Sequence, residues 1–438
     1  MQTCKEAIDW IEQQAPYGIK PGLERMEKLL EKLGNKHRRL KSIHVAGTNG
    51  KGSTTEFLQK AMSEAGIEVG TFTSPYVTHF RERIAMNGQP VSEEDFLAAA
   101  NEVKPYVDEL AEEAEGHPTS FEIVTAVAVQ YFATRAFPDV VVFETGLGGR
   151  LDATNVVKPM ISLITNIGED HQAILGHTKA EIAREKAGIV KSGVPLATTE
   201  KDPEIRRYFD EVATSLRTKT YQLDRDFFIE DWEALSAGQK FKFRSPYPFG
   251  TKEGVELKME GAHQAENAAL AMMALDYLKM LYALPIEEDN IRRGLLEAHW
   301  PGRIEKVSEA PDVYLDGAHN RQGVEQLAAF VQQRYAEKNV YIVATVTEEK
   351  TPEELFAPLM ELQPAKMYLA PYTGYKALPE AELVKHAHAI EAEPASSISA
   401  ALEAVQVDAE AEDLVLITGS LYFISAVREF LHQTNWKI

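Results

Sequence analysis

Short apolar runs alternate with amphipathic stretches over much of the chain, a pattern typical of a parallel sheet with helices between its strands. In the first part of the chain, Ile43–Ala46, Asp139–Glu144 and Met160–Ile167 are apolar runs of strand length. The segments Lys51–Ala65 and Thr119–Ala136 have the apolar spacing of helices. This alternation predicts an α/β fold.

The pattern changes between about residue 218 and residue 260. Aromatic residues that alternate with polar and turn residues there predict antiparallel hairpins at the edge of the domain. Two helices are expected next, at Gln264–Tyr282 and Ile286–Ala298. The segment Trp300-Pro301-Gly302 then breaks the pattern, and it is the candidate linker.

Strands and helices alternate again after this linker, which predicts a second doubly wound unit. The expected strands are Val313–Leu315, Val340–Val346, Met367–Leu369 and Leu414–Thr418, and the expected helices are Val324–Ala336 and Pro352–Leu362. The chain has 438 residues, which is longer than a domain with a single hydrophobic core usually is. We therefore expect two domains, residues 1–297 and residues 298–438.

Composition and charge narrow the class of protein. Apolar residues make up 44% of the chain and charged residues 26%, as in globular proteins. No apolar run is long enough to span a bilayer and the N-terminus lacks the apolar stretch of a signal peptide, so no membrane association is expected. The net charge of −21 argues against a general affinity for nucleic acid. The single cysteine, Cys4, excludes an internal disulfide and fits a cytoplasmic location.

The strongest local signal is a glycine-rich turn between a strand and a helix, Gly47–Thr54, with the sequence GTNGKGST. Glycines let backbone N–H groups approach phosphate oxygens, and a helix N-terminus favours anions. Lys51 would bring positive charge to the phosphates, and a hydroxyl group would bind Mg²⁺. The segment departs from the standard phosphate-loop pattern at Val45 and Gly52, but its position between strand and helix favours nucleotide binding over a turn without a ligand.

Two predicted strands lead to residues of types that bind metal ions. Glu144 ends one strand, and the chain after the next strand leads to His171. Because the carboxyl ends of parallel strands meet at one edge of a sheet, both side chains would lie beside the phosphate loop. A single acid or histidine at a strand end is commonly structural, whereas two beside a phosphate loop predict a metal site.

These motifs resemble those of the Mur ligases and their folate-directed relatives. The loop GTNGKGS is the form of phosphate loop found in that superfamily. The chain is similar to the folylpolyglutamate synthase/dihydrofolate synthase family from Pro21-Gly22-Leu23 to Thr418-Gly419-Ser420. The resemblance implies a Mur-ligase-like ATPase domain with a parallel central sheet and a small antiparallel extension, followed by a C-terminal Rossmann-like α/β domain. It also implies an ATP-dependent ligase that adds L-glutamate to the γ-carboxylate of a folate through an acyl phosphate.

The resemblance further implies roles for individual residues. The implied ligands of two Mg²⁺ ions are Ser53, Glu144, His171 and a carbamylated Lys186. The implied nucleotide-binding residues are Gly47, Thr48, Asn49, Gly50, Lys51, Gly52, Ser53, Thr54, Asn267, Arg303 and Asp316. The implied catalytic residues are Lys51, Lys186, Asp316 and His319. The implied substrate-binding residues are Ser74, Arg83, Phe121 and Asp152. A carbamate on Lys186 would supply an anionic oxygen where a bare ammonium group would repel the cation.

Two positions depart from the usual pattern of the family. Tyr76 stands where histidine is usual, in the loop that resembles the mobile loop near the pterin. Arg321 stands where proline usually follows Asn320, which leaves room for Arg321 to face a substrate carboxylate.

Three other functions stay open. A dihydrofolate synthase, or a bifunctional enzyme, would use dihydropteroate as the acceptor, and an assay would separate it from the first interpretation. A cell-wall Mur ligase is less favoured, because the loops at residues 144–155 favour folate and no UDP-binding domain precedes the phosphate loop. A nucleotide-binding switch would lack the cluster of Glu144, His171 and Lys186. We expect a monomer with small-molecule substrates, and a monovalent cation is a further candidate cofactor.

Overall fold

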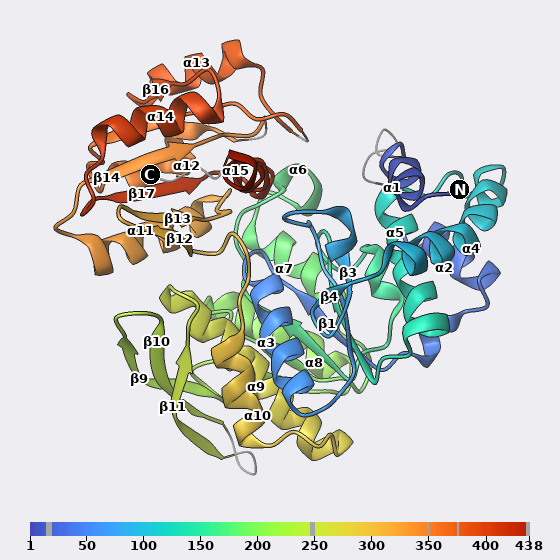
Figure 1. The fold of residues 1–438 in the computed structure, drawn as a ribbon. Helices are drawn as coiled ribbons and strands as arrows, with labels where there is room; N and C mark the ends of the chain where they lie inside the picture. Colours follow the sequence, from blue (N-terminus) through green and yellow to red (C-terminus); the bar gives the residue numbers. More distant parts are fainter. Residues whose placement is uncertain (15–19, 246–249, 349, 375, 435–438) are drawn as a thin grey trace. The chain divides into compact units, whose positions relative to one another are not determined.

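The computed structural model describes residues 1–14, 20–245, 250–348, 350–374 and 376–434, and these form two compact units (Figure 1). The first unit consists of Met1–Ala234, Lys240–Leu257 and Ala265–Ala298, and the second consists of Leu235–Gln239, Lys258–Gln264 and His299–Ile438. The last division falls between Ala298 and His299, just before the candidate linker. None of the helices in the described ranges combines the length and apolar character that crossing a bilayer requires.

The first unit is built on an eight-stranded sheet with the strand order β4-β3-β2-β5-β1-β6-β7-β8. The strands are β1 (Ser42–Ala46), β2 (Val69–Phe72), β3 (Ile84–Met86), β4 (Gln89–Pro90), β5 (Val140–Glu144), β6 (Ile161–Ile164), β7 (Leu196–Thr198) and β8 (Thr220–Gln222). The pairs from β2 to β8 are parallel, and β3 and β4 add an antiparallel edge. All five residues of β1 and all five of β5 are buried, as expected for strands that are covered on both faces.

Helices connect these strands and cover the sheet. They are α1 (Cys4–Glu12), α2 (Glu24–Lys32), α3 (Lys51–Glu64), α4 (Glu93–Ala111), α5 (Ser120–Tyr131), α6 (Gln172–Leu175), α7 (Lys179–Ala187), α8 (Pro203–Ser215), α9 (Ala262–Tyr282) and α10 (Glu288–Glu297). Short 3-10 helices lie at Lys36–Arg39, Phe80–Arg83 and Ala153–Val156, and a π-helical turn at Phe132–Ala136 continues α5.

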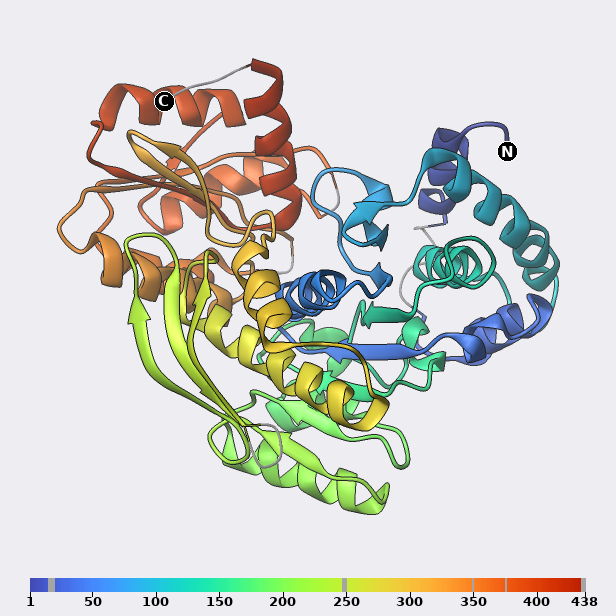
Figure 2. The same ribbon diagram turned by 60° about the horizontal axis from the view of Figure 1, so that its bottom comes forward.

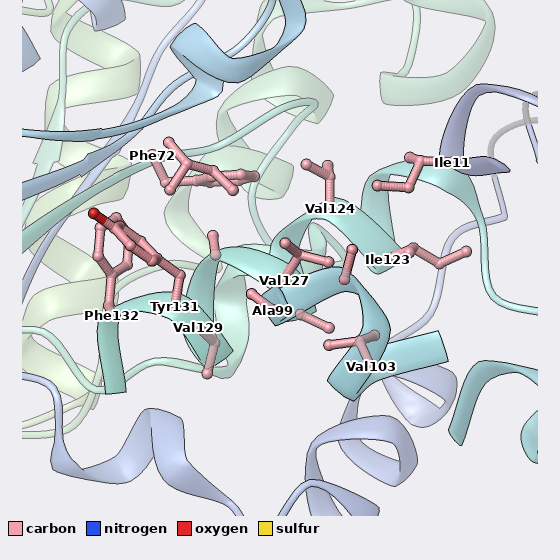
Figure 3. Close-up of a cluster of buried hydrophobic side chains, with 14 of the residues drawn as sticks. Ile11, Phe72, Ala99, Val103, Ile123, Val124, Val127, Val129, Tyr131 and Phe132 are labelled. Carbon is pink, nitrogen blue, oxygen red and sulfur yellow. The ribbon is translucent and has the colours of Figure 1, made fainter. Parts of the chain in front are cut away.

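One large apolar core lies around α5 (Figure 3). Ile123 and Val127 of α5 pack with Ile11 of α1, Val103 of α4 and Phe72 of β2 in one buried cluster. A second cluster joins α7 and α8 to β6 and β7. The helix α3 packs against β1, β2 and β5, and α10 packs closely on α3. The loops after β1, β5 and β6 are therefore anchored on rigid elements.

A small three-stranded sheet is attached to the long helix α9 (Figure 2). Its strands are β9 (Phe228–Ala234), β10 (Gln239–Arg244) and β11 (Thr251–Leu257), in the order β11-β10-β9. Their short connections allow only antiparallel pairing. A buried ion pair fixes this sheet to α9, because Lys252 Nζ lies 2.8 and 2.7 Å from the two carboxylate oxygens of Asp276. Both side chains are only 6% exposed.

The second unit contains a six-stranded sheet with the strand order β12-β13-β17-β14-β15-β16. Its strands are β12 (Glu305–Glu309), β13 (Asp312–Leu315), β14 (Val340–Ala344), β15 (Lys366–Leu369), β16 (Glu393–Pro394) and β17 (Leu414–Thr418). Its helices are α11 (Arg321–Tyr335), α12 (Pro352–Met360), α13 (Glu380–Ala389), α14 (Ile398–Asp408) and α15 (Leu421–Thr434). One buried cluster joins α11, α12 and α13 to the sheet, and another joins α14 and α15 to it. All pairs from β13 to β16 are parallel, and β12 is antiparallel to β13. This is the predicted doubly wound unit.

Arg334 of α11 binds the two short segments that the second unit takes from the middle of the chain. Its guanidinium group donates to the carbonyl oxygens of Leu235 and Gly238 and to a carboxylate oxygen of Glu260 at 2.6 Å. Glu260 also accepts a bond from the backbone N–H of Gly238 at 3.0 Å. Both charged side chains are about 15% exposed or less, so this cluster is a buried anchor.

Most predicted elements of both units are confirmed, and the differences are local. The strand expected at Met160–Ile167 is shorter, because Thr165–Ile167 turn into the loop at the sheet edge. The prediction of hairpins from residue 218 is wrong for Thr220–Gln222, which pair in parallel with β7 as the edge strand of the main sheet. Within the same stretch, residues 246–249 lie outside the described residues.

Candidate functional site

The central strand β1 lies between β5 and β6, and the loops after all three strands leave the same edge of the sheet. The register pairs Val45 with Glu144 and Ala46 with Ile164. The chain continues from β1 to β2 on one side, whereas β6 lies on the other side of β1, so the strand order switches direction here. Ligands of open α/β sheets bind at such a switch point, beyond the carboxyl ends of the strands.

The phosphate loop is held by the loop that follows β6. The backbone N–H of Thr48 donates to the carbonyl oxygen of Asn166 at 2.9 Å. The N–H of Asn49 donates to Oδ1 of Asn166 at 3.0 Å, and Nδ2 of Asn166 donates to the carbonyl oxygen of Asn49 at 3.1 Å. The shape of the loop before α3 is therefore set by a side chain more than 100 residues away in the sequence.

Two glycines of this loop have close neighbours where a side chain would begin. Gly47 has φ +152°, and a Cβ atom there would lie 1.8 Å from Oγ1 of Thr165. Gly50 has φ +84°, and a Cβ atom there would lie 2.2 Å from Oδ1 of Asn267. Asn267 belongs to α9 and is 3% exposed, so the structure brings this predicted nucleotide-binding residue directly against the phosphate loop.

The residues that open α3 are well placed for phosphate and metal chemistry. Lys51 Nζ donates to the carbonyl oxygens of Gly47 and Thr48 at 3.1 and 3.2 Å. Ser53 and Thr54 lie in the first turn of the helix and are buried. The first turn of a helix presents backbone N–H groups and a favourable field to an anion.

Lys186 of α7 reaches the same loop from the other side. Its side chain is 3% exposed, and its Nζ donates to the carbonyl oxygen of Gly47 at 2.9 Å. Burial, reinforced by the positive charge of Lys51, lowers the pKa of Lys186 to about 7, although Asp170 and Asp152 oppose this shift. Two lysine side chains thus donate to one backbone carbonyl oxygen, and the more buried of them, Lys186, is the one whose pKa is lowered.

Two predicted metal ligands come next in the same region. Glu144 lies at the end of β5, and His171 lies in the loop after β6. Glu144 is 3% exposed, and its Oε2 accepts a long bond from the backbone N–H of Ser74 at 3.4 Å. His171 has φ +50°, and its backbone N–H donates to Oδ1 of Asp170 at 2.9 Å. Because Mg²⁺ is commonly held by one or two carboxylates together with phosphate oxygens and waters, one carboxylate, one imidazole and the Ser53 hydroxyl are a donor set that fits it.

No three His, Cys, Asp or Glu side chains in the described part of the chain are grouped as a metal cage.

Phe121 lies next to the turn that follows Glu144. A Cβ atom at Gly146 would lie 2.5 Å from the Phe121 ring, so the ring packs directly on this backbone. The ring is also 5.8 Å from that of Phe72, and Phe121 is half-buried at the start of α5. A half-buried aromatic ring beside the carboxyl ends of the strands is a candidate surface for a flat ring.

Asp152 is buried and its carboxylate is occupied by its own loop. Oδ2 accepts from the backbone N–H of Leu147 at 2.9 Å, and Oδ1 accepts from that of Thr154 at 2.9 Å. Burial raises the pKa of Asp152, and these hydrogen bonds oppose the shift. Nε2 of His44 lies 2.8 Å from Oγ1 of Thr154. Asp152 therefore holds the loop from the end of β5, and its direct contact with a substrate stays a prediction.

Arg83 lies over two aromatic rings. Its guanidinium carbon is 5.2 Å from the ring centroids of both Tyr76 and Phe80. Tyr76, which stands where the family usually has histidine, thus serves as a ring partner for Arg83. Ser74, in the same loop, is half-buried.

In the second unit, Asp316 and His319 lie in the loop after β13. Asp316 accepts from the backbone N–H groups of Ile304 and Ala318 at 2.9 and 2.8 Å. Burial raises the pKa of Asp316, and the neighbouring Arg303 opposes the shift. His319 Nδ1 lies 2.9 Å from the carbonyl oxygen of Gly317. The structure therefore groups three of the predicted site residues within this unit.

Sequence reasoning missed two residues that organise the site, Asn166 and Asp170. Asn166 binds the phosphate loop, and Asp170 contacts the backbone of His171 and lies near Lys186. Both belong to the polar segment that leads from β6 to His171. Their position in the sequence could have identified them, because polar residues just after a buried parallel strand lie at the ligand-binding edge of the sheet.

Comparisons with known proteins agree with this architecture. The family model described as "Mur ligase middle domain" matches residues 45–275, and the model described as "Dihydrofolate synthetase, C-terminal domain" matches residues 303–431. A dihydrofolate synthase/folylpolyglutamate synthase from Bacillus subtilis is 41% identical over 436 residues, which cover 98% of this chain and 99% of that protein.

Two solved structures show the same fold. The folylpolyglutamate synthase from Thermotoga maritima has a TM-score of 0.85 and 33% identity, with 98% of this chain and 97% of that chain covered. Escherichia coli FolC, in complex with DHPP and ADP, has a TM-score of 0.86 and 29% identity, with 98% of each chain covered. The predicted fold class is confirmed, and the chain belongs to the dihydrofolate synthase/folylpolyglutamate synthase family.

Proposed function

We propose that this chain uses ATP to couple L-glutamate to the γ-carboxylate of a folate such as tetrahydrofolate. The observation that carries the proposal is the meeting of the phosphate loop, Glu144 and Lys186 at one sheet edge. This arrangement occurs in a chain that is 41% identical, over nearly its whole length, to an enzyme named for this activity.

In the first step, an oxygen of the folate γ-carboxylate attacks the γ-phosphorus of ATP. The bond between that phosphorus and the bridging oxygen of ADP breaks, which gives an acyl phosphate and ADP. Backbone N–H groups of the phosphate loop and the charge of Lys51 bind the phosphates and offset the charge that develops on them. Asn267, which lies against Gly50, is the candidate for contact with the adenine side.

In the second step, the amine of glutamate attacks the acyl carbon. Phosphate leaves, the nitrogen loses one proton, and an amide remains. We assign contact with the nucleotide phosphates to Arg303, because arginine stays charged and binds oxygens through two N–H groups. Asp316 and His319 are the candidates for the remaining catalytic contacts in the second unit.

Ser53, Glu144 and His171 are the residues that would hold Mg²⁺. Bound Mg²⁺ supplies positive charge to phosphate oxygens. Glu144 is buried at the end of β5, and Ser53 is buried at the start of α3. Both therefore present oxygens of fixed position. On the acceptor side, we propose that the Phe121 ring stacks on the flat ring of the folate and that Ser74, Arg83 and Asp152 shape its site.

We also propose that Lys186 is carbamylated. The unprotonated amine is the form that attacks carbon dioxide, and burial beside Lys51 favours that form. Carbamylation forms a bond from Nζ to the carbon of carbon dioxide and releases one proton, and the carbamate would give Lys186 a negative oxygen as a candidate metal ligand.

Incubation with ¹³C-bicarbonate should give a carbamate ¹³C signal in the wild-type protein that is absent from Lys186→Ala. The same variant should lose at least about tenfold in kcat, because an anionic ligand is missing. Lys191 lies in the same region, but its side chain is only half-buried. Lys191→Ala is therefore the matched control and should keep the signal. A wild-type spectrum without the signal in active enzyme would exclude the modification.

ADP release measured with tetrahydrofolate or dihydropteroate, each with and without glutamate, tests the function itself. The proposal expects release that requires both tetrahydrofolate and glutamate. A second candidate, dihydrofolate synthase activity, is favoured by the double name of the Bacillus subtilis relative. It would appear as glutamate-dependent release with dihydropteroate. Release that ignores glutamate would contradict both candidates.

A further inference from the structure

A buried ion pair lies next to Phe121 and is not explained by the phosphate or metal chemistry. Arg25 of α2 contacts Glu122 of α5 through two nitrogens, with Nε to Oε2 at 3.2 Å and Nη2 to Oε1 at 3.1 Å. The side chain of Arg25 is 12% exposed and that of Glu122 is 5% exposed. The contact between Nε and Oε2 is a hydrogen bond, whereas Nη2 and Oε1 lie only within ion-pair distance.

Each partner of this pair has a second contact. The Glu122 carboxylate accepts from the backbone N–H of Thr119 at 2.7 Å, and Thr119 Oγ1 accepts from the N–H of Glu122 at 3.2 Å, which together form a capping box. Arg25 Nη2 also donates to the carbonyl oxygen of Lys20 at 2.6 Å. The pair therefore ties the chain before α2 to the first turn of α5.

The position of Phe121 depends on this first turn. The later turns of α5 are fixed by their buried side chains, such as Ile123 and Val127, in the core of the first unit (Figure 3). Phe121 itself is only half-buried and lies at the rim of that core. Two sets of contacts therefore bear on Phe121: its ring packs on Gly146 and Phe72, and its backbone lies in the turn that Glu122 and Thr119 cap.

We propose that Arg25 is a positioning residue for the acceptor substrate: its ion pair with Glu122 orients the first turn of α5 so that Phe121 presents its ring to the flat ring of the folate. The proposal rests on the proposed function, which assigns that ring to Phe121. It predicts a defect confined to the acceptor, because Arg25 makes no contact with the phosphate loop in the described contacts.

Arg25→Met keeps an unbranched side chain but removes the charge and the N–H donors. It should raise the KM for tetrahydrofolate or dihydropteroate about tenfold or more, with the KM for ATP and kcat changed less than about twofold. Lys252→Met is the matched control, since it breaks another buried ion pair of the same unit, with Asp276. It should lower Tm without changing the KM for the acceptor.

A double variant separates positioning from stability. Arg25→Met combined with Glu122→Gln leaves no unpaired buried charge and keeps an oxygen that can cap Thr119. Its Tm should recover relative to Arg25→Met, whereas the KM for the acceptor should stay raised. If the KM recovers together with Tm, or if Lys252→Met raises it equally, Arg25 serves stability alone and the proposal is overturned.

Calorimetric titration of the whole protein with folate and with dihydropteroate measures the same effect without turnover. Weaker binding by Arg25→Met than by the wild type supports the positioning role, even if the wild type shows no glutamate-dependent ADP release and the proposed function fails. Equal binding by the two proteins overturns the positioning role alone. A wild type that binds neither compound overturns both.

Discussion

Replacing Lys51 with alanine should lower kcat for glutamate-dependent ADP release by about 100-fold or more. Two effects add in this variant. The positive charge that offsets the phosphate charge is lost, and so are the two hydrogen bonds from Nζ to the carbonyl oxygens of Gly47 and Thr48. The variant should fold normally, because Lys51 is half-buried and lies at the start of a helix whose core contacts are unchanged.

Lys60→Ala is the matched control for Lys51→Ala. Lys60 lies on the same helix and makes a long ion pair with Glu56, at 3.9 Å, four residues earlier. A pair this long contributes little, so both Tm and kcat should stay close to those of the wild type. Normal turnover by Lys51→Ala would show that the loop binds something other than the reacting phosphates.

Gly50→Ala should lower kcat/KM for ATP by about 100-fold, because the new methyl group would occupy the space of the Asn267 carboxamide. Asn267 is 3% exposed, so it cannot move aside without disturbing α9 or the loop. The variant should bind ATP weakly in calorimetry even where its overall fold is intact.

Gly66→Ala separates this effect from backbone strain. Gly66 has φ +75°, close to the +84° of Gly50, but no atom lies within 4 Å of its would-be Cβ. Both variants place alanine in the left-handed region, which costs about 1 kcal/mol. Gly66→Ala should therefore lose stability alone. Equal losses of ATP binding in the two variants would show that strain, and not contact with Asn267, is the cause.

The elements that the sequence predicts well are those whose pattern lies within one continuous segment of the chain. The phosphate loop is a continuous segment in which glycines, lysine and hydroxyls follow a strand and open a helix, so its structure depends on its own residues. Strands such as Leu414–Thr418 were predicted with their observed limits, because a strand buried on both faces has a continuous apolar run.

Contacts between distant segments could not be predicted from local patterns. The helix that carries Asn267 has an ordinary apolar pattern, and only the resemblance pointed to this residue; its packing on Gly50 needed the folded chain. The same holds for Asn166 on the phosphate loop and for the pair of Arg25 with Glu122, 97 residues apart. The strand Thr220–Gln222 was misassigned because three residues carry too little pattern to distinguish an edge strand from a hairpin.

The anchor around Arg334 determines how this protein can be divided. A fragment that begins at residue 299 would keep the arginine but lose Leu235, Gly238 and Glu260, the groups that its guanidinium binds. The complementary fragment would carry these groups without their cation. The C-terminal sheet is continuous in sequence, but Arg334 binds two segments that precede it, so we expect a domain exchanged between relatives to be more stable when both segments move with it.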